Sequence, residues 1–164
     1  MKGIYVHGYE SDNLGGKIKW SKGQANIYNP LIDYPHQTKN RAGFEHWFER
    51  YKGYDYYIGS SMGGYLAFYM AMRAGVPCFL INPSLNFKPD MSPFTMPDFA
   101  LEQRAEISIL LGTEDTVIPN VEVYDFIKKH QLNCNIATVA AGHRIELDKF
   151  KPHFLNFLKS LNQQ

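Results

Sequence analysis

The stretch Gly59-Ser60-Ser61-Met62-Gly63-Gly64 decides the fold class of this chain. A short apolar run, Asp55–Ile58, comes directly before it, and a longer apolar run, Tyr65–Ala74, comes directly after it. The first run has the length and aromatic content of a buried strand, and the second has the length of a buried helix that stops at Gly75. The stretch is therefore predicted to be a tight turn that leads from a strand into a helix.

The same alternation continues on both sides of this turn. Five further apolar runs are predicted as strands: Gly3–His7, Ala25–Tyr28, Cys78–Ile81, Ile107–Leu111 and Asn135–Val139. Four further segments are predicted as helices: Leu14–Trp20, Arg41–Tyr51, Val121–His130 and Glu146–Leu161. In the last of these, Pro152 suggests that the helix begins at or just before that residue. Alternating strands and helices predict a three-layer α/β fold, with a mostly parallel central sheet flanked by helices.

Length and composition predict one globular domain over residues 1–164. A chain of 164 residues falls within the usual size of one domain and is long enough to bury a sizeable core. Aromatic residues make up 15% of the chain, which excludes disorder as its dominant state. No apolar run approaches the roughly 20 residues that span a bilayer, so no membrane span is expected.

Charge and cysteine content exclude several other classes of protein. The chain has 17 Lys and Arg against 16 Asp and Glu, which predicts no basic face for nucleic acid. Its first residues lack the apolar core of a signal peptide. Cys78 and Cys134 lie in apolar segments and are predicted to be reduced core thiols, without the spacing of a zinc site. We therefore expect a cytoplasmic protein that binds no metal.

Ser61 is the predicted nucleophile of an enzyme. Gly59 and Gly63 flank it in the pattern G-x-S-x-G, which marks a strand-to-helix turn that exposes the serine hydroxyl. Glycines are needed at these positions because the strand and helix backbones approach each other closely. Ser60 is out of register with the pattern because no glycine flanks it at the required spacing.

Two further strand ends supply an acid and a base. Asp115 lies in the loop after Ile107–Leu111 and on its own would be read as a turn or capping carboxylate. With a candidate nucleophile upstream and a histidine downstream it is predicted as the catalytic acid, with its neighbour Glu114 as the alternative. His143 follows the strand Asn135–Val139 and is predicted as the general base. No motif surrounds four other histidines, which are expected to be structural or exposed: His36, His46, His130 and His153.

The oxyanion hole of such an enzyme needs two backbone N–H groups. Met62 directly follows the nucleophile and is predicted to supply the first. Tyr9, in the loop after the first strand, is the candidate for the second, because Gly8 allows a sharp turn there. His7 is predicted to be a structural hydrogen-bonding residue under that loop.

With these residues identified, the chain resembles the α/β-hydrolase superfamily and, more narrowly, the compact bacterial YqiA/YcfP-type esterases. The matching segments are Ile4–Gly8, Ile58–Gly64, Asn82-Pro83, Gly112–Pro119 and Gly142-His143. The resemblance implies a mostly parallel sheet flanked by helices and a serine hydrolase that acts on carboxylic esters. Larger members carry a cap domain, but here the corresponding interval is only the proline-rich segment Ser84–Arg104, so a minimal cap or none is expected.

The function expected from the sequence is a serine esterase. It would hydrolyse small-molecule carboxylic esters or thioesters through an acyl-enzyme, using Ser61, Asp115 and His143 without a cofactor. An acyltransferase with the same three residues is one alternative. A non-catalytic ligand-binding protein with this fold is another, because a fold alone does not determine function.

Overall fold

The computed structural model describes residues 1–9, 11–32, 34, 44–86 and 101–163. Within these residues, six strands form one sheet in the order β2-β1-β3-β4-β5-β6, and every neighbouring pair is parallel. The strands are β1 (Gly3–Val6), β2 (Ile27–Tyr28), β3 (Tyr56–Ser60), β4 (Cys78–Ile81), β5 (Ile107–Gly112) and β6 (Cys134–Val139). All six strands lie within two residues of their predicted positions at each end.

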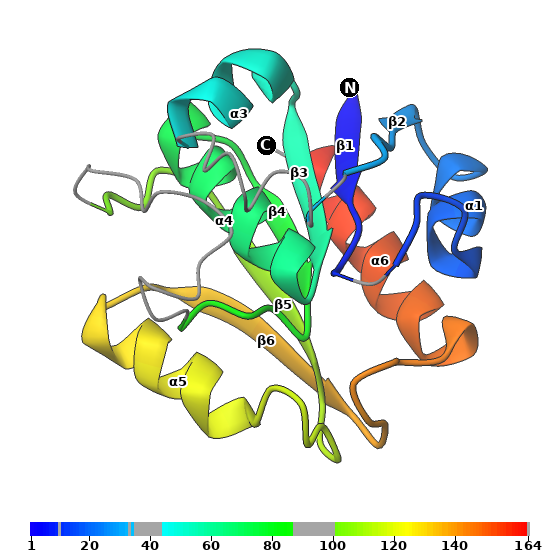
Figure 1. The fold of residues 1–164 in the computed structure, drawn as a ribbon, viewed down its shortest axis with the longest axis vertical. Coiled ribbons are helices and arrows are strands. Elements are labelled where there is room, and N and C mark those ends of the chain that lie inside the picture. Colours follow the sequence, from blue (N-terminus) through cyan, green and yellow to red (C-terminus); the bar gives the residue numbers. More distant parts are fainter. Residues whose placement is uncertain (10, 33, 35–43, 87–100, 164) are drawn as a thin grey trace.

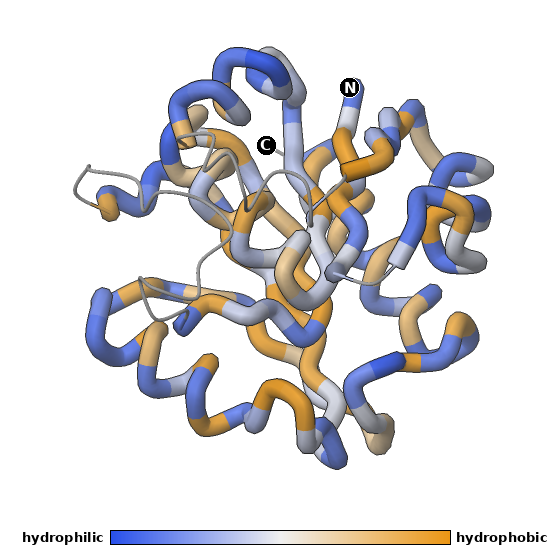
Figure 2. Tube along the Cα trace, viewed as in Figure 1, coloured by the Kyte–Doolittle hydropathy of each residue, from blue (hydrophilic) through white to orange (hydrophobic). Residues whose placement is uncertain are grey.

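Five helices of the described part cover the sheet on both faces, as the three-layer fold requires (Figure 1). They are α1 (Gly16–Lys22), α3 (Phe44–Tyr51), α4 (Met62–Ala74), α5 (Asn120–Lys129) and α6 (Leu147–Leu161). Helices α3, α4 and α5 pack on one face, and α1 and α6 pack on the other. Figure 2 shows hydrophobic residues concentrated on the central strands, whereas α5 alternates between hydrophobic and hydrophilic residues along its length.

Two separate apolar clusters form the core, one on each face of the sheet. Successive residues of a strand point to opposite faces, so Ile4 and Val6 of β1 join the cluster beneath α3, α4 and α5, whereas Tyr5 joins the other. The second cluster is rich in aromatic residues from α6, of which Phe150 and Phe154 are completely buried. Burial on both faces explains why the inner strands β1, β3, β4 and β5 read as nearly continuous apolar runs.

The order of the strands places a crevice at the carboxyl ends of β1 and β3. After β1 the chain adds β2 on one side, and it then returns to add β3 on the other side of β1. In open parallel sheets, ligands bind at such a switch point, beyond the carboxyl ends of the strands. The last residues of neighbouring strands are in register there, with Val6 opposite Gly59 and Ser60 opposite Ile81.

The start of α6 differs from one expectation drawn from the sequence. The helix begins at Leu147, well upstream of Pro152, which lies inside it. Proline at this position removes one backbone hydrogen bond of the helix. The buried aromatic face of the helix maintains it across the proline. Phe150 lies before Pro152, Phe154 and Phe157 lie after it, and all three rings belong to the same core cluster.

The two cysteines differ in burial. Neither described cysteine forms a disulfide: Cys78 is buried and Cys134 is half-buried. Burial raises the pKa of both thiols, that of Cys134 to about 11.

No helix in the described ranges is long and apolar enough to cross a membrane. The described part of Ser84–Arg104 contains no cap domain, and residues 87–100 of that segment lie outside the described residues.

The glycines that flank Ser61 have a steric role. A Cβ atom added to Gly59 would lie 2.3 Å from the Gly63 carbonyl oxygen, and one added to Gly63 would lie 2.3 Å from the carbonyl oxygens of Val6 and His7. Because these neighbours are backbone atoms, no side-chain rotation can relieve the clash. The pattern G-x-S-x-G is therefore required for α4 to begin directly against the ends of β1 and β3.

We expect Gly63→Ala to destabilise the protein by about 3 kcal/mol or more, because its methyl group must displace the backbone of β1. Chemical denaturation monitored by circular dichroism measures this change. Gly16→Ala is the matched control, since nothing lies within 4 Å of an added Cβ there and alanine favours a helix. Equal midpoints for Gly63→Ala and the unaltered protein would contradict this packing argument.

Candidate active site

Ser61 occupies a strained turn between β3 and α4. Its backbone dihedral angles are φ 54° and ψ −122°, in a region that residues other than glycine rarely adopt. Such strain costs on the order of 1–3 kcal/mol and is concentrated at functional sites. The turn is stabilised by the Ser61 carbonyl oxygen, which accepts hydrogen bonds from the N–H groups of Gly64 and Ser84 at 2.9 and 3.0 Å. Ser60 is instead the last residue of β3.

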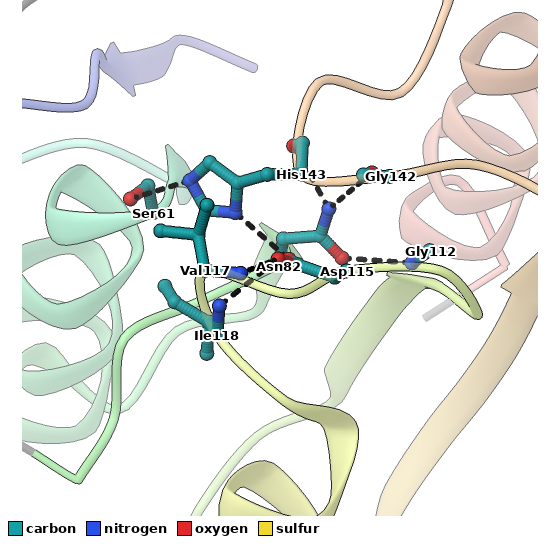
Figure 3. A network of polar contacts seen from close by, with 8 residues as sticks. All are labelled: Ser61, Asn82, Gly112, Asp115, Val117, Ile118, Gly142 and His143. Carbon is teal, nitrogen blue, oxygen red and sulfur yellow. Dashed lines mark hydrogen bonds and ion pairs between the residues drawn. The ribbon is translucent and has the colours of Figure 1, made fainter.

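The structure brings Ser61, His143 and Asp115 into one chain of contacts (Figure 3). The Nε2 atom of His143 lies 3.0 Å from Ser61 Oγ, and its Nδ1 atom lies 2.8 Å from Asp115 Oδ2. A carboxylate can only accept hydrogen bonds, so Nδ1 is the donor. With its proton on Nδ1, the neutral imidazole can accept the Ser61 hydroxyl proton at Nε2.

The Asp115 carboxylate is fixed by three donors. Its Oδ1 atom accepts hydrogen bonds from the backbone N–H groups of Val117 and Ile118 at 2.8 and 2.9 Å, and Oδ2 accepts one from His143. The Asp115 side chain has no exposed surface, whereas that of His143 is 22% exposed. The turn-capping role that the sequence offered as an alternative for Asp115 is therefore also present, on the other carboxylate oxygen.

The alternative acid and the remaining histidines occupy other places. Glu114 is exposed, and the carboxylate that contacts His143 belongs to Asp115. His46 lies on α3, His153 lies on α6, and His130 follows α5. Burial and the neighbouring charge of Lys129 lower the pKa of His130. His36 lies outside the described residues.

The loop after β1 lies against Ser61. A Cβ atom added to Gly8 would lie 3.3 Å from Ser61 Cβ, so a side chain here would fit only if a neighbour shifted slightly. His7 is 2% exposed and accepts a hydrogen bond from the Ile32 N–H at Nε2, 2.9 Å away. Its Nδ1 atom therefore carries the ring proton and donates to the Gly8 carbonyl oxygen at 2.8 Å. His7 has the structural role predicted for it.

The contact between His7 and Gly8 orients the next peptide group. In a trans peptide the carbonyl and the following N–H point in opposite directions, and the described residues include no cis peptide bond. With the Gly8 carbonyl directed at the His7 ring, the Tyr9 N–H points away from that ring. Met62 is the first residue of α4, and the first N–H groups of a helix have no acceptor within the helix.

Asn82 belongs to this site, although its sequence neighbourhood predicted no role for it. It follows β4, is 2% exposed, and has a positive φ of 41°. Its Oδ1 atom accepts a hydrogen bond from the Gly112 N–H at 2.8 Å, and its Nδ2 group donates to the carbonyl oxygen of His143 at 2.9 Å and more weakly to that of Gly142 at 3.3 Å. Figure 3 shows its amide between the two loops that carry Asp115 and His143.

We expect Asn82→Gly to lower kcat by about 100-fold with a smaller effect on KM. Glycine keeps the positive φ but removes the amide, so the His143 loop loses its link to β5, and misplacement by about 1 Å can cost this much in rate. Steady-state kinetics on an ester substrate measure both constants. The matched control is Gln131→Gly, which replaces another residue with positive φ, near the end of α5. Equal kcat in the two variants would contradict the positioning role.

Ser61 and His143 open into a cavity of about 750 Å³. The loop after β1 and the start of α1 form the opposite wall. Lys17 and Arg144 also line this cavity. Among the described residues, no group of three or more His, Cys, Asp and Glu side chains is arranged to hold a metal ion.

A family comparison identifies the group of proteins to which the chain belongs. The model of the Uncharacterised protein family (UPF0227) matches residues 2–95, more than half of the chain. The chain belongs to this family. The matched region includes the loop after β1, the turn at Ser61 and Asn82, whereas Asp115 and His143 lie beyond it. The UPF0227 match thus supports the YqiA-type resemblance drawn from the sequence.

Solved structures place this UPF0227 member within the α/β-hydrolase fold. A proposed hydrolase of the α/β superfamily from Xanthomonas campestris pv. campestris has a TM-score of 0.73 and 21% identity, covering 97% of this chain and 98% of the other. The ydeN gene product of B. subtilis has a TM-score of 0.68 and 15% identity, covering 100% of both chains. Est1E from Butyrivibrio proteoclasticus has a TM-score of 0.73 and 15% identity, covering 99% of this chain and 88% of its own.

These similarities establish the fold, not the reaction, because the identities are low. Est1E has also been solved with ferulic acid bound. No curated protein matches the sequence. The catalytic assignment for this chain therefore depends on the geometry of its own residues.

Proposed function

We propose that this protein is a serine esterase that hydrolyses carboxylic esters or thioesters through an acyl-enzyme, the whole chain acting as one α/β-hydrolase domain. The observation that carries the proposal is the chain of contacts from Ser61 through His143 to Asp115, with distances of 3.0 and 2.8 Å. This arrangement of nucleophile, base and orienting carboxylate defines the serine hydrolase triad by geometry rather than by sequence position.

In the first half of the reaction, Ser61 Oγ attacks the ester carbonyl carbon while His143 Nε2 takes the hydroxyl proton. Asp115 keeps the imidazole in the tautomer that can accept this proton and stabilises the imidazolium that results. The backbone N–H groups of Met62 and Tyr9 stabilise the oxyanion of the tetrahedral intermediate. His143 then gives its proton to the leaving alcohol, and the acyl group remains on Ser61.

In the second half, water replaces the alcohol. His143 takes a proton from water, the hydroxide attacks the acyl carbon, and the carboxylic acid leaves as Ser61 regains its proton. The ferulic acid bound to Est1E is a carboxylic acid, which is the class of product expected here. All described groups that the reaction requires come from the ends of β1, β3, β5 and β6.

Ester hydrolysis in water enriched in ¹⁸O tests the proposal. We expect p-nitrophenyl butyrate to release p-nitrophenol and butyric acid that carries ¹⁸O from the solvent, detected by mass spectrometry. The rate should depend on Ser61. A product acylated on an added alcohol, with little butyric acid, would favour the acyltransferase alternative. Absence of any turnover across esters and thioesters of graded acyl length would favour the ligand-binding alternative.

A further inference from the structure

Two cations face the cavity that contains the proposed nucleophile. Lys17 lies in the first turn of α1, and Arg144 directly follows His143. Both line the same cavity as Ser61 and His143. The proposed hydrolytic steps use neither side chain. Their positions on the wall of this cavity place two positive charges where a substrate would bind.

Lys17 is anchored rather than freely extended into solvent. Its Nζ atom donates a hydrogen bond to the carbonyl oxygen of Ile145 at 2.7 Å, which ties α1 to the segment that carries His143 and Arg144. Burial lowers the pKa of Lys17; the charge of Glu146 raises it and that of Arg144 lowers it. An ammonium group has three donors, so this backbone contact leaves two for a ligand.

The charge of these cations is only partly balanced by the described residues. No described carboxylate forms an ion pair with Lys17 or Arg144. Glu146, the carboxylate whose charge raises the pKa of Lys17, forms an ion pair with Lys149 at 3.2 Å. Asp12 also lines the cavity and accepts a hydrogen bond from the Leu14 N–H. Two cations against one carboxylate make the described cavity wall net positive.

The uncharged part of the wall contains many small residues. Many of its residues are glycine or serine: Gly8, Gly15, Gly16, Ser11, Ser60 and Ser61. Of the apolar residues, Tyr5 and Ile18 are almost fully buried beneath the wall, which leaves mainly Tyr9 and Val117 exposed to a ligand.

We propose that the substrate is a small ester that carries an anionic group, a carboxylate or a phosphate, bound between Lys17 and Arg144 while its ester carbonyl lies at Ser61. This inference rests on the proposed esterase function and adds the substrate class. Both anions share the oxygen acceptors that guanidinium and ammonium groups bind. The same contacts would leave a neutral ester without a partner for either cation.

Four esters separate charge from reactivity: neutral phenyl acetate, 4-acetoxybenzoate, 4-acetoxyphenyl phosphate and monophenyl succinate. The second and third carry a carboxylate or a phosphate on the alcohol side, and the fourth carries a carboxylate on the acyl side. For each protein, kcat/KM for an anionic ester is divided by kcat/KM for phenyl acetate. This ratio is then compared between the variants and the unaltered protein, so that the intrinsic reactivity of each ester cancels. At least one anionic ester should show a ratio about tenfold lower in Arg144→Gln, and lower again in Arg144→Glu.

The variants are chosen to keep the fold intact. Arg144 is exposed, and no described hydrogen bond involves its side chain. Lys17→Gln is the second test and should lower the same ratio. It also removes the contact with Ile145, and a general loss of activity from that change cancels in the ratio. Lys19→Gln is the matched control, because it removes one exposed positive charge from α1 at a residue that does not line the cavity, and its ratio should stay unchanged.

The possible outcomes test the anionic substrate separately from the proposed esterase function. Ratios that stay within twofold in all Arg144 and Lys17 variants, while hydrolysis of phenyl acetate still requires Ser61, would overturn the anionic substrate and leave the esterase. An equal fall in Lys19→Gln would also overturn it, because the effect would then come from overall charge. If hydrolysis of none of the four esters requires Ser61, both proposals are wrong.

Discussion

Replacing Ser61 with alanine is expected to lower kcat for ester hydrolysis by about 10⁶-fold, because the nucleophile of the acyl-enzyme is then missing. The fold should survive. The only described hydrogen bond of the Ser61 hydroxyl is to His143, and the hydrogen bonds of the turn use backbone atoms that alanine retains. Turnover of p-nitrophenyl butyrate measures the loss, and circular dichroism verifies that the variant is folded.

Ser60→Ala is the matched control for this prediction. Ser60 is the preceding residue, also lines the cavity, and ends β3 in regular backbone geometry. Its replacement should cost far less than that of Ser61. Equal losses at the two positions would mean that the register of the turn is wrong, and near-normal turnover by Ser61→Ala would reject the nucleophile.

Asp115→Asn is expected to lower kcat by about 10⁴-fold, and the structure explains why the amide cannot adapt. Asn can keep an acceptor oxygen toward the Val117 and Ile118 N–H groups only by turning its NH₂ toward His143. The opposite orientation would direct the NH₂ at two backbone donors. A donor facing Nδ1 forces the ring proton onto Nε2, which can then no longer accept the Ser61 proton.

Two measurements check this explanation. Glu114→Gln, which changes the exposed neighbouring carboxylate, should reduce activity only mildly. Proton NMR of the imidazole should place the ring proton on Nδ1 in the unaltered protein and on Nε2 in Asp115→Asn. A large loss in Glu114→Gln together with a small one in Asp115→Asn would assign the acid to the other residue.

Much of the fold could be predicted because local sequence signals and tertiary structure agree. The inner strands β1, β3, β4 and β5 are buried on both faces, so they read as short apolar runs, whereas the edge strands β2 and β6 are partly exposed. The strand-turn-helix unit around Ser61 is marked by glycines that the packing requires. The expectation that α6 begins at or just before Pro152 failed because buried aromatic side chains outweigh the local preference of proline.

What could not be predicted depends on contacts between distant segments. Asn82 reaches Gly112 across 30 residues and His143 across 61 residues, and nothing in its own sequence neighbourhood marks that role. Lys17 meets the carbonyl of Ile145 across 128 residues, which places its charge next to Arg144. In the sequence Lys17 belongs to a small basic cluster with Lys19 and Lys22, a pattern that is typical of a solvated face.

Labelling with a fluorophosphonate probe tests the central claim most directly, because the probe phosphonylates a serine only when a base activates it. Trypsin should release a peptide over residues 53–73 that contains both Ser60 and Ser61, and its fragmentation distinguishes the two. The proposed mechanism predicts one adduct, on Ser61, that is absent from Ser61→Ala and strongly slowed in His143→Gln. An unlabelled folded protein, or an adduct elsewhere with Ser61 unmodified, would contradict it.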